Sequence, residues 1–220
     1  MNILERLGNL DRRWWFLVLA VIVALPIVKP MGLPTSVGDW AKQTKETLDL
    51  VQPGDKVLFS CSYSAGGGPD VHPGAQVLFK ILLNKGAKVI LVSFTPQGDS
   101  FAEQICREAE AAGAKYGTDF VNLGFIAGAE TAVATYAANP SGVFSNDFRG
   151  NPVSELPAYQ GVTTAADFGL TVLVCTGMPG VEEWTRQITN PYKVPAIICV
   201  NTNGATRSVP YLQSGQIQGL

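Results

Sequence analysis

The sequence predicts an α/β fold: a three-layer, Rossmann-like sandwich of about five mostly parallel strands, preceded by one N-terminal transmembrane helix. Short apolar runs alternate with helical patterns throughout residues 56–220, and glycine or short polar residues follow each run. Strands separated by helices pair in parallel through right-handed crossovers, which places helices on both faces of the sheet. A separate uncharged apolar run near the N-terminus predicts the membrane helix.

The apolar run WWFLVLAVIVALPIV covers residues 14–28. As a helix it is about 22 Å long, shorter than the ~30 Å hydrocarbon core of a bilayer. Extension to residue 33 closes this gap, because Lys29 near the helix end can place its ammonium group in the interface. Residues 14–33 are therefore predicted to form a single transmembrane helix in contact with membrane lipid.

Basic residues precede this helix and indicate its orientation. Arg6, Arg12 and Arg13 lie in the basic segment 1–13. The positive-inside rule then predicts a cytoplasmic N-terminus and an extracytoplasmic α/β domain at the cell membrane. Two interpretations compete with this single-pass signal anchor. A cleaved signal peptide would need an A-x-A site, which we do not find, and a buried core helix would show a polar stripe.

Residues 34–55 are predicted to form a linker and a first helix. Pro34 stiffens the exit from the membrane, and Ser36 followed by Asp39 resembles a capping box. The sequence Pro53-Gly54-Asp55 stops this helix before the α/β domain begins.

Within the α/β domain, five apolar runs are typical of parallel strands buried on both faces: 56–63, 88–95, 119–126, 170–176 and 196–201. Helical patterns lie between them at 73–85, 100–116 and 130–138, and a further helix begins at Pro179 and Gly180. Ser100 and Glu103 match a capping box at the start of the second of these helices. The order of the strands stays open at this point.

Residues 139–157 form the longest irregular insertion, and loops of this length are usually functional or interaction surfaces. Asp147 and Arg149, inside the insertion, suit either a turn held by local polar contacts or a patch that faces a partner. The polar tail 208–220 is a second candidate interaction segment, with Tyr211 and Gln213 as its candidate contact residues.

The composition excludes some partners and predicts no cofactor. The formal net charge of −2 gives no indication of nucleic acid as a partner. Charged residues make up 15% of the chain, below the usual ~25%, which favours a surface covered by other protein subunits or by a homo-oligomer. The four cysteines show no C-x-x-C and no zinc spacing, and buried thiols are the simplest interpretation. Three of them lie in predicted strands: Cys61, Cys175 and Cys199. Whether a disulfide joins two of these three stays open.

Ligands of doubly wound sheets bind at the carboxyl ends of the strands. The residues at these ends are rich in glycine and short polar side chains, a composition that ordinary βα loops share. The Gly66–Gly68 run would let a backbone approach an anion, but it matches neither nucleotide-binding glycine motif. The candidate ligand-binding residues are Ser62, Ser64, Gly66, Gly67, Gly68, Thr95, Asp99, Glu130, Thr176, Asn201 and Asn203.

Evidence for catalysis is sparse. Asp70 and His72 are weak catalytic candidates, as an orienter and a base, although a helix start before Pro73 explains His72 more simply. A serine nucleophile would depend on His72, the sole histidine, and the context lacks G-x-S-x-G. No acidic residues show the spacing of metal ligands, so no metal site is predicted.

Three stretches resemble a family of uncharacterised prokaryotic membrane-anchored proteins: YGTDFVNLGFIAGAE at 116–130, DFRGNPVSELP at 147–157 and PYLQSGQIQGL at 210–220. The resemblance implies a transmembrane helix before a Rossmann-like α/β domain of this size, and no assigned chemistry. Family members continue toward further membrane segments. This chain stops at Leu220, which implies either a shortened paralogue or a C-terminal end that packs against another subunit.

Three functional hypotheses follow. The first is a non-catalytic, membrane-anchored structural or interaction subunit of a larger membrane complex, which the anchor, the low charge and the insertion favour. The second is a membrane-tethered ligand-binding or sensor domain with a cleft at the strand ends. The third, and the weakest, is a hydrolase or transferase that uses Asp70 and His72.

Overall fold

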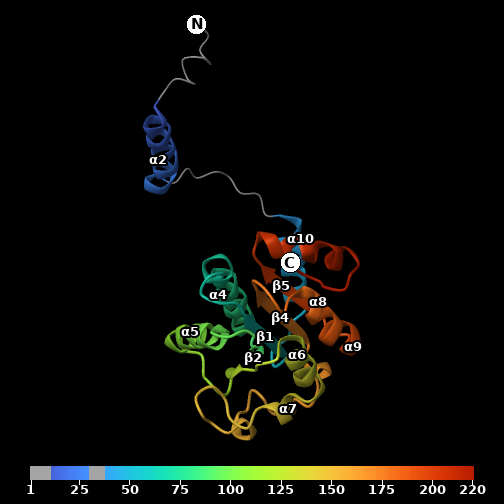
Figure 1. Ribbon diagram of the computed structural model, residues 1–220. Coiled ribbons are helices and arrows are strands. Elements are labelled where there is room, and N and C mark those ends of the chain that lie inside the picture. The colour runs from blue at the N-terminus through green and yellow to red at the C-terminus, as the bar shows by residue number, and fades with distance from the viewer. Residues whose placement is uncertain (1–10, 30–37) are drawn as a thin grey trace. The chain divides into compact units, whose positions relative to one another are not determined.

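The computed structural model describes residues 11–29 and 38–220 (Figure 1). The chain divides into an N-terminal unit, Met1–Val37, and a domain, Gly38–Leu220. The C-terminal end of the predicted membrane segment, residues 30–33, and Ser36 of the predicted capping box lie outside the described residues.

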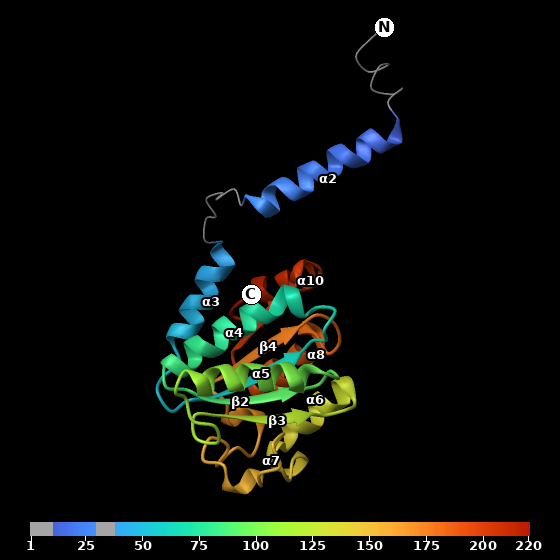
Figure 2. The same ribbon diagram turned by 90° about the vertical axis from the view of Figure 1, so that its left-hand side faces the viewer.

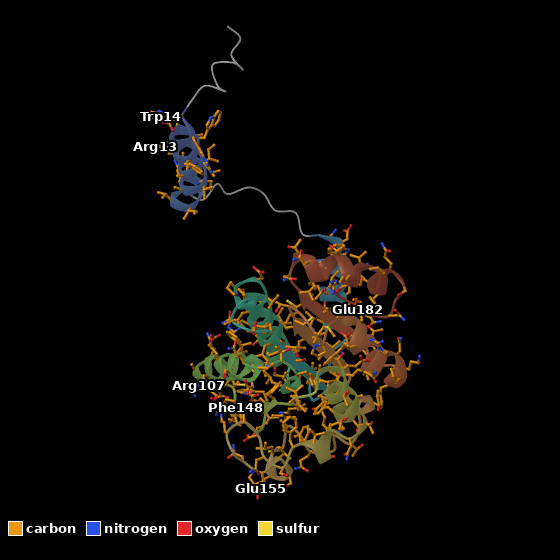
Figure 3. The ribbon with its side chains drawn as sticks, viewed as in Figure 1. Arg13, Trp14, Arg107, Phe148, Glu155 and Glu182 are labelled. Carbon is orange, nitrogen blue, oxygen red and sulfur yellow. The ribbon has the colours of Figure 1, made fainter. Side chains whose placement is uncertain are left out.

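Helix α2 spans Arg12–Val28, and the Asp11 carboxylate caps it by accepting a hydrogen bond of 2.9 Å from the Arg13 backbone N–H. Its large apolar side chains are all exposed, and Figure 3 marks Arg13 and Trp14 in its first turn. Among residues 11–29 and 38–220, no helix combines the length and the hydropathy that crossing a bilayer requires.

Five parallel strands form one sheet in the order β3-β2-β1-β4-β5. This confirms the predicted α/β class and its Rossmann-like arrangement. Each strand lies within one or two residues of its prediction, because strands buried on both faces are continuous apolar runs. Their bounds are β1 Lys56–Ser62, β2 Lys88–Ser93, β3 Phe120–Phe125, β4 Leu170–Cys175 and β5 Ala196–Val200.

Helices cover both faces of the sheet, which gives three layers. One face packs against α3 Asp39–Asp49, α4 Gly68–Asn84 and α5 Gly98–Ala111, the side that Figure 2 turns toward the viewer. The other face packs against α6 Ala129–Ala138, α8 Val181–Trp184, a π-helical turn Thr185–Thr189, α9 Asn190–Tyr192 and α10 Thr202–Gln213.

Alternation along the strands supplies both cores. In β1, Leu58 faces the core on the α6 side, whereas Val57 and Phe59 face the core on the α4 side. The α6 side also buries Trp184 completely, and its indole N–H donates a 3.1 Å hydrogen bond to Thr171 Oγ1.

The predicted irregular insertion contains two short helices, α7 Pro140–Val143 and η1 Val153–Glu155, and another, η2 Ala165–Asp167, follows it. It is packed onto the domain, because Pro140, Val153 and Leu156 are buried. Figure 3 marks its exposed residues Phe148 and Glu155.

Three helix starts differ from the prediction. Helix α4 begins at Gly68, so Asp70 and His72 lie in its first turns rather than before it. Helix α5 begins at Gly98 after Gln97, so Ser100 is not its cap. Helix α3 begins at Asp39 after Gly38, which offers no side-chain cap.

The C-terminal tail was predicted as a polar interaction segment, and most of it contacts the domain itself. Its first part belongs to α10, and its last part pairs with the edge of the sheet. Gln218 N–H donates to the Ala196 carbonyl at 2.8 Å, and Ile198 N–H donates to the Gly219 carbonyl at 3.0 Å. The buried side chain of Ile217 secures this return.

Candidate functional site

The strand order reverses between β1 and β4, and a Rossmann-like sheet usually opens a ligand crevice there. In this protein Thr176 fills the position. A Cβ on Gly67 would lie only 2.5 Å from Thr176 Oγ1, and one on Gly68 would lie 3.5 Å from the Phe101 ring. Close packing therefore explains why residue 67 is a glycine. A Cβ on Gly66 would meet nothing closer than Ser64 Oγ at 4.0 Å, so packing does not explain Gly66.

Ser62 lies inside the sheet rather than in a cleft. It is 1% exposed, its Oγ lies 2.7 Å from Ser60 Oγ, and it accepts a 3.3 Å hydrogen bond from Phe94 N–H. Thr95, at the end of β2, has a buried Oγ1 without a partner among the described residues. Neither hydroxyl belongs to the cavity described below.

The two acidic candidates make local or structural contacts. Asp99 accepts a 2.8 Å hydrogen bond from the N–H of Ser100. Glu130 forms an ion pair of 2.9 Å with Arg186 and accepts a 2.8 Å hydrogen bond from Gln187. Glu130 thereby joins α6 to the π-helical turn rather than facing a ligand.

Three predicted residues do come together. Thr176, Asn201 and Asn203 line a cavity of about 200 Å³ at the carboxyl ends of β4 and β5. Asn201 also caps α10, since its Oδ1 accepts a 3.0 Å hydrogen bond from Gly204 N–H. The other lining residues are Cys175, Gly177, Met178, Gly180, Val181, Glu182, Val200, Gly204, Arg207 and Ser208.

Two charged residues of this cavity were missed by sequence reasoning. Arg207 comes from α10 and Glu182 from α8, where Figure 3 marks it. Within the described part of the chain, neither forms an ion pair or a side-chain hydrogen bond. A predicted α10 would have revealed Arg207, because it lies four residues after Asn203 on the same helix face.

His72 is oriented by a tyrosine rather than by Asp70. Tyr63 Oη lies 2.7 Å from His72 Nδ1, and the Phe101 ring lies 5.5 Å from the imidazole centroid. Burial lowers the pKa of His72 and raises the pKa of Tyr63. Among the described residues, no hydrogen bond joins His72 to Asp70 or to a serine, so the contact that activates a nucleophile is absent there.

The cysteines behave as buried thiols. Burial raises the pKa of Cys61 and of Cys175 to about 12, and that of Cys199 to about 11. The thiolate is the reactive form, so these side chains are unreactive at neutral pH. All four cysteines are free, and the described residues contain no cluster of three side chains that could hold a metal ion.

Asp147 holds a turn of the insertion. Its Oδ1 accepts hydrogen bonds from the N–H groups of Arg149 at 2.9 Å and Asn151 at 2.7 Å. Its Oδ2 accepts a 2.9 Å hydrogen bond from the hydroxyl of Tyr116. These contacts match the local polar turn that was one of the two interpretations of Asp147.

Arg149 fastens the same turn to α5. Its guanidinium pairs with Glu110 at 2.7 Å and with the buried Glu103 at 3.0 Å, and it lies 3.7 Å from the Tyr116 ring centroid. These contacts raise the pKa of Arg149, and the hydrogen bonds with Glu110 are the largest cause. The charge of Arg149 is thus compensated inside the molecule.

A larger and mostly apolar groove of about 890 Å³ lies between α3, α4 and β5. Trp40 of α3 and Val77 of α4 line it and remain 46% and 58% exposed. The groove residues also include Ala41, Thr44, Lys45, Leu48, Asp49, Pro73, Gly74, Leu78, Ile81, Ile197, Ile198, Cys199, Val200, Ala205 and Leu220.

Comparison of the chain with protein-family models and with curated proteins finds no significant match. Two surface features of the domain bear on function. They are the apolar groove beside α3 and the small polar cavity between α8 and α10.

Proposed function

We propose that this protein is a non-catalytic, membrane-anchored interaction subunit of a larger membrane complex. In this proposal the apolar groove binds the apolar face of a helix from another subunit. The observation that carries the proposal is the groove itself, with two large apolar side chains exposed in its walls.

The size and lining of the groove favour a macromolecular partner. Its volume of about 890 Å³ lies near the upper end of small-molecule pockets, but its surface is almost entirely apolar and offers few polar groups to orient a metabolite. Its walls are two helices and an edge strand, a shape that suits a helix laid into a groove. Trp40 supplies the kind of large, exposed aromatic side chain that dominates interface energies.

The proposed membrane anchor favours a partner that is also in the membrane. In this proposal residues 14–33 lie in the bilayer, so only residues 34–38 separate the anchor from α3, and five residues span at most about 18 Å. Anchoring two proteins in one bilayer at this reach raises their effective concentration, which supports binding even through a modest interface.

The proposal includes the membrane anchor, the orientation of that anchor and the resemblance of the domain to a family of membrane-anchored proteins. The uncharged side chains of α2 are fully available to lipid, with Trp14 60% and Val28 83% exposed. Arg6, Arg12 and Arg13, which precede the uncharged run 14–28, favour a cytoplasmic N-terminus and an extracytoplasmic domain. The resemblance of three stretches of the domain to membrane-anchored prokaryotic proteins agrees with this arrangement.

A non-catalytic role agrees with the chemistry of the described side chains. His72 is hydrogen-bonded to Tyr63 and does not touch a serine. The thiols of Cys61, Cys106 and Cys175 are buried, burial raises the pKa of Cys199 to about 11, and Ser62 is inside the sheet. A hydrolase or transferase would need at least one of these groups to be accessible and activated.

Co-purification of matched variants tests the groove. The full chain is extracted from native membranes in mild detergent, and the stoichiometry of any bound subunit is measured. We expect Trp40→Ser combined with Val77→Ser to release the partner subunit, whereas Leu50→Ser retains it. Leu50 is a suitable control because it is 74% exposed and lies outside the groove.

Two results would overturn this proposal. One is a bound subunit that the groove variant retains at unchanged stoichiometry. The other is a particle that contains only copies of this chain, since the groove would then be a homo-oligomer interface. Trp40 is 46% and Val77 58% exposed, so each substitution should lower the free energy of unfolding by less than about 1 kcal/mol, and the variant should stay folded.

A further inference from the structure

We infer that the cavity at the carboxyl ends of β4 and β5 binds a small zwitterion, an α-amino acid with a short apolar side chain. This site is separate from the apolar groove, and the inference does not depend on the proposed interaction function. It assigns a sensing or regulatory ligand to the domain.

The cavity size limits the ligand. About 200 Å³ lies below the ~300–1,000 Å³ of pockets for drug-sized ligands and cofactors. This volume favours a molecule smaller than a nucleotide. The ligand is therefore a molecule of only a few non-hydrogen atoms.

The charges of the cavity define the class of ligand. Arg207 and Glu182 line it from two different helices, and no ion pair joins them to each other or to another described residue. Two opposite charges that line one small cavity without pairing with each other suit a ligand that carries both charges. An arginine guanidinium binds a carboxylate, and a glutamate carboxylate binds an ammonium group.

Neutral groups of the same cavity complete the recognition. Asn203 lies in the first turn of α10, where the helix dipole favours the negative end of a ligand near Arg207. The Thr176 hydroxyl has no hydrogen-bond partner among the described residues and can donate or accept.

The apolar part of the cavity lining favours a ligand with a short apolar side chain. Val181 and Val200 offer aliphatic surface, and Met178 lines the cavity while remaining 70% exposed. An exposed methionine at a pocket adapts its shape to a small apolar group. Glycine, alanine or a similarly short amino acid matches this surface and the available volume.

Thermal unfolding of the purified full chain in detergent tests the inference, with a saturable rise of Tm as the readout. The probes are glycine, L-alanine and L-serine, with acetate and methylamine as single-charge controls. We expect at least one of the three amino acids to raise Tm, whereas neither single-charge compound does at the same concentration. A rise with acetate equal to that with the amino acid, or no rise with any of the three, overturns the inference.

Charge-removing variants locate the site. Arg207→Gln and Glu182→Gln should each weaken binding of the active amino acid at least tenfold. Arg107→Gln and Glu155→Gln are the matched controls, because they remove the same charges from exposed positions outside the cavity (Figure 3). Binding that survives both cavity variants overturns the inference, whereas the copy number of any bound protein subunit does not bear on it.

Discussion

The apolar groove and the polar cavity share strand β5 and differ in almost every other property. Val200 lines both. The groove has a volume of about 890 Å³ and exposes a tryptophan, whereas the cavity has about 200 Å³ and carries two unpaired charges. Size and polarity therefore favour different partners for the two surfaces, and the proposed partners are a protein helix for the groove and a small zwitterion for the cavity.

The cavity also lies at a different place from the glycine-rich loop after β1. In many doubly wound proteins that loop supplies the ligand crevice. In this protein Gly67 packs closely against Thr176 at the switch point. The cavity lies one strand further along, at the ends of β4 and β5.

Two tryptophans give the largest expected contrast between the regions. Trp184 is fully buried in the core on the α6 side and donates a hydrogen bond to Thr171, so Trp184→Ala should lower the free energy of unfolding by about 3–5 kcal/mol. Trp40→Ala in the groove should lower it by less than about 1 kcal/mol, because Trp40 is 46% exposed. Urea unfolding of the two variants measures both values, and equal losses would contradict the assignment of Trp40 to a binding surface.

The groove variant should separate the two binding functions. Trp40→Ser with Val77→Ser removes the apolar anchors of the proposed interface, at a cost of about 2 kcal/mol or more in subunit binding. Calorimetric binding of the amino acid should remain unchanged, since neither residue lines the cavity. A parallel loss of both activities would show that the two surfaces are one site.

The reciprocal variant acts on the cavity alone. Arg207→Gln removes the only cationic side chain of the cavity lining, and the Kd of the amino acid should rise at least tenfold, or about 1.4 kcal/mol. Subunit stoichiometry after mild extraction should stay as in the wild type. Release of the subunit by this substitution would contradict the separation of groove and cavity.

Protonation of His72 at low pH should lower the free energy of unfolding without changing binding at the groove or the cavity. Burial lowers the pKa of His72 below its ordinary value of 6.5, and the charge of Glu108 opposes this only partly. The unfolded chain therefore takes up a proton before the folded one, so the stabilising contribution of neutral His72 is present above pH 6.5 and is lost as pH falls below it.

Unfolding of the wild type and of His72→Gln between pH 5 and 8 measures this effect. The difference in slope between the two proteins below pH 6.5 is the contribution of His72. Amino-acid binding should show no dependence on this substitution, because His72 lines neither the groove nor the cavity.

The strands were predictable from local pattern alone. The runs VLF at 57–59 and VILV at 89–92 are apolar without interruption, as is typical of a strand buried on both faces. The strand order was not predictable, because it depends on contacts between segments far apart in the chain. The start of α4 was predicted too late, since Gly66–Gly68 and Pro69 are weak helix signals that packing overrides.

The missed helix α10 explains most of what sequence reasoning missed at the site. Its sequence contains Gly204 and Pro210, both unfavourable in a helix interior. The Asn201 cap and the contacts of Tyr211 with the core stabilise it. Without this helix Arg207 had no predicted neighbours, so the cavity was represented by Thr176, Asn201 and Asn203 only.

Native mass measurement after mild detergent extraction tests whether this chain functions within a larger membrane complex. We expect a particle in which the 23.4 kDa chain is joined by at least one different polypeptide at fixed stoichiometry. A particle whose protein mass equals that of a single chain would contradict the proposed function.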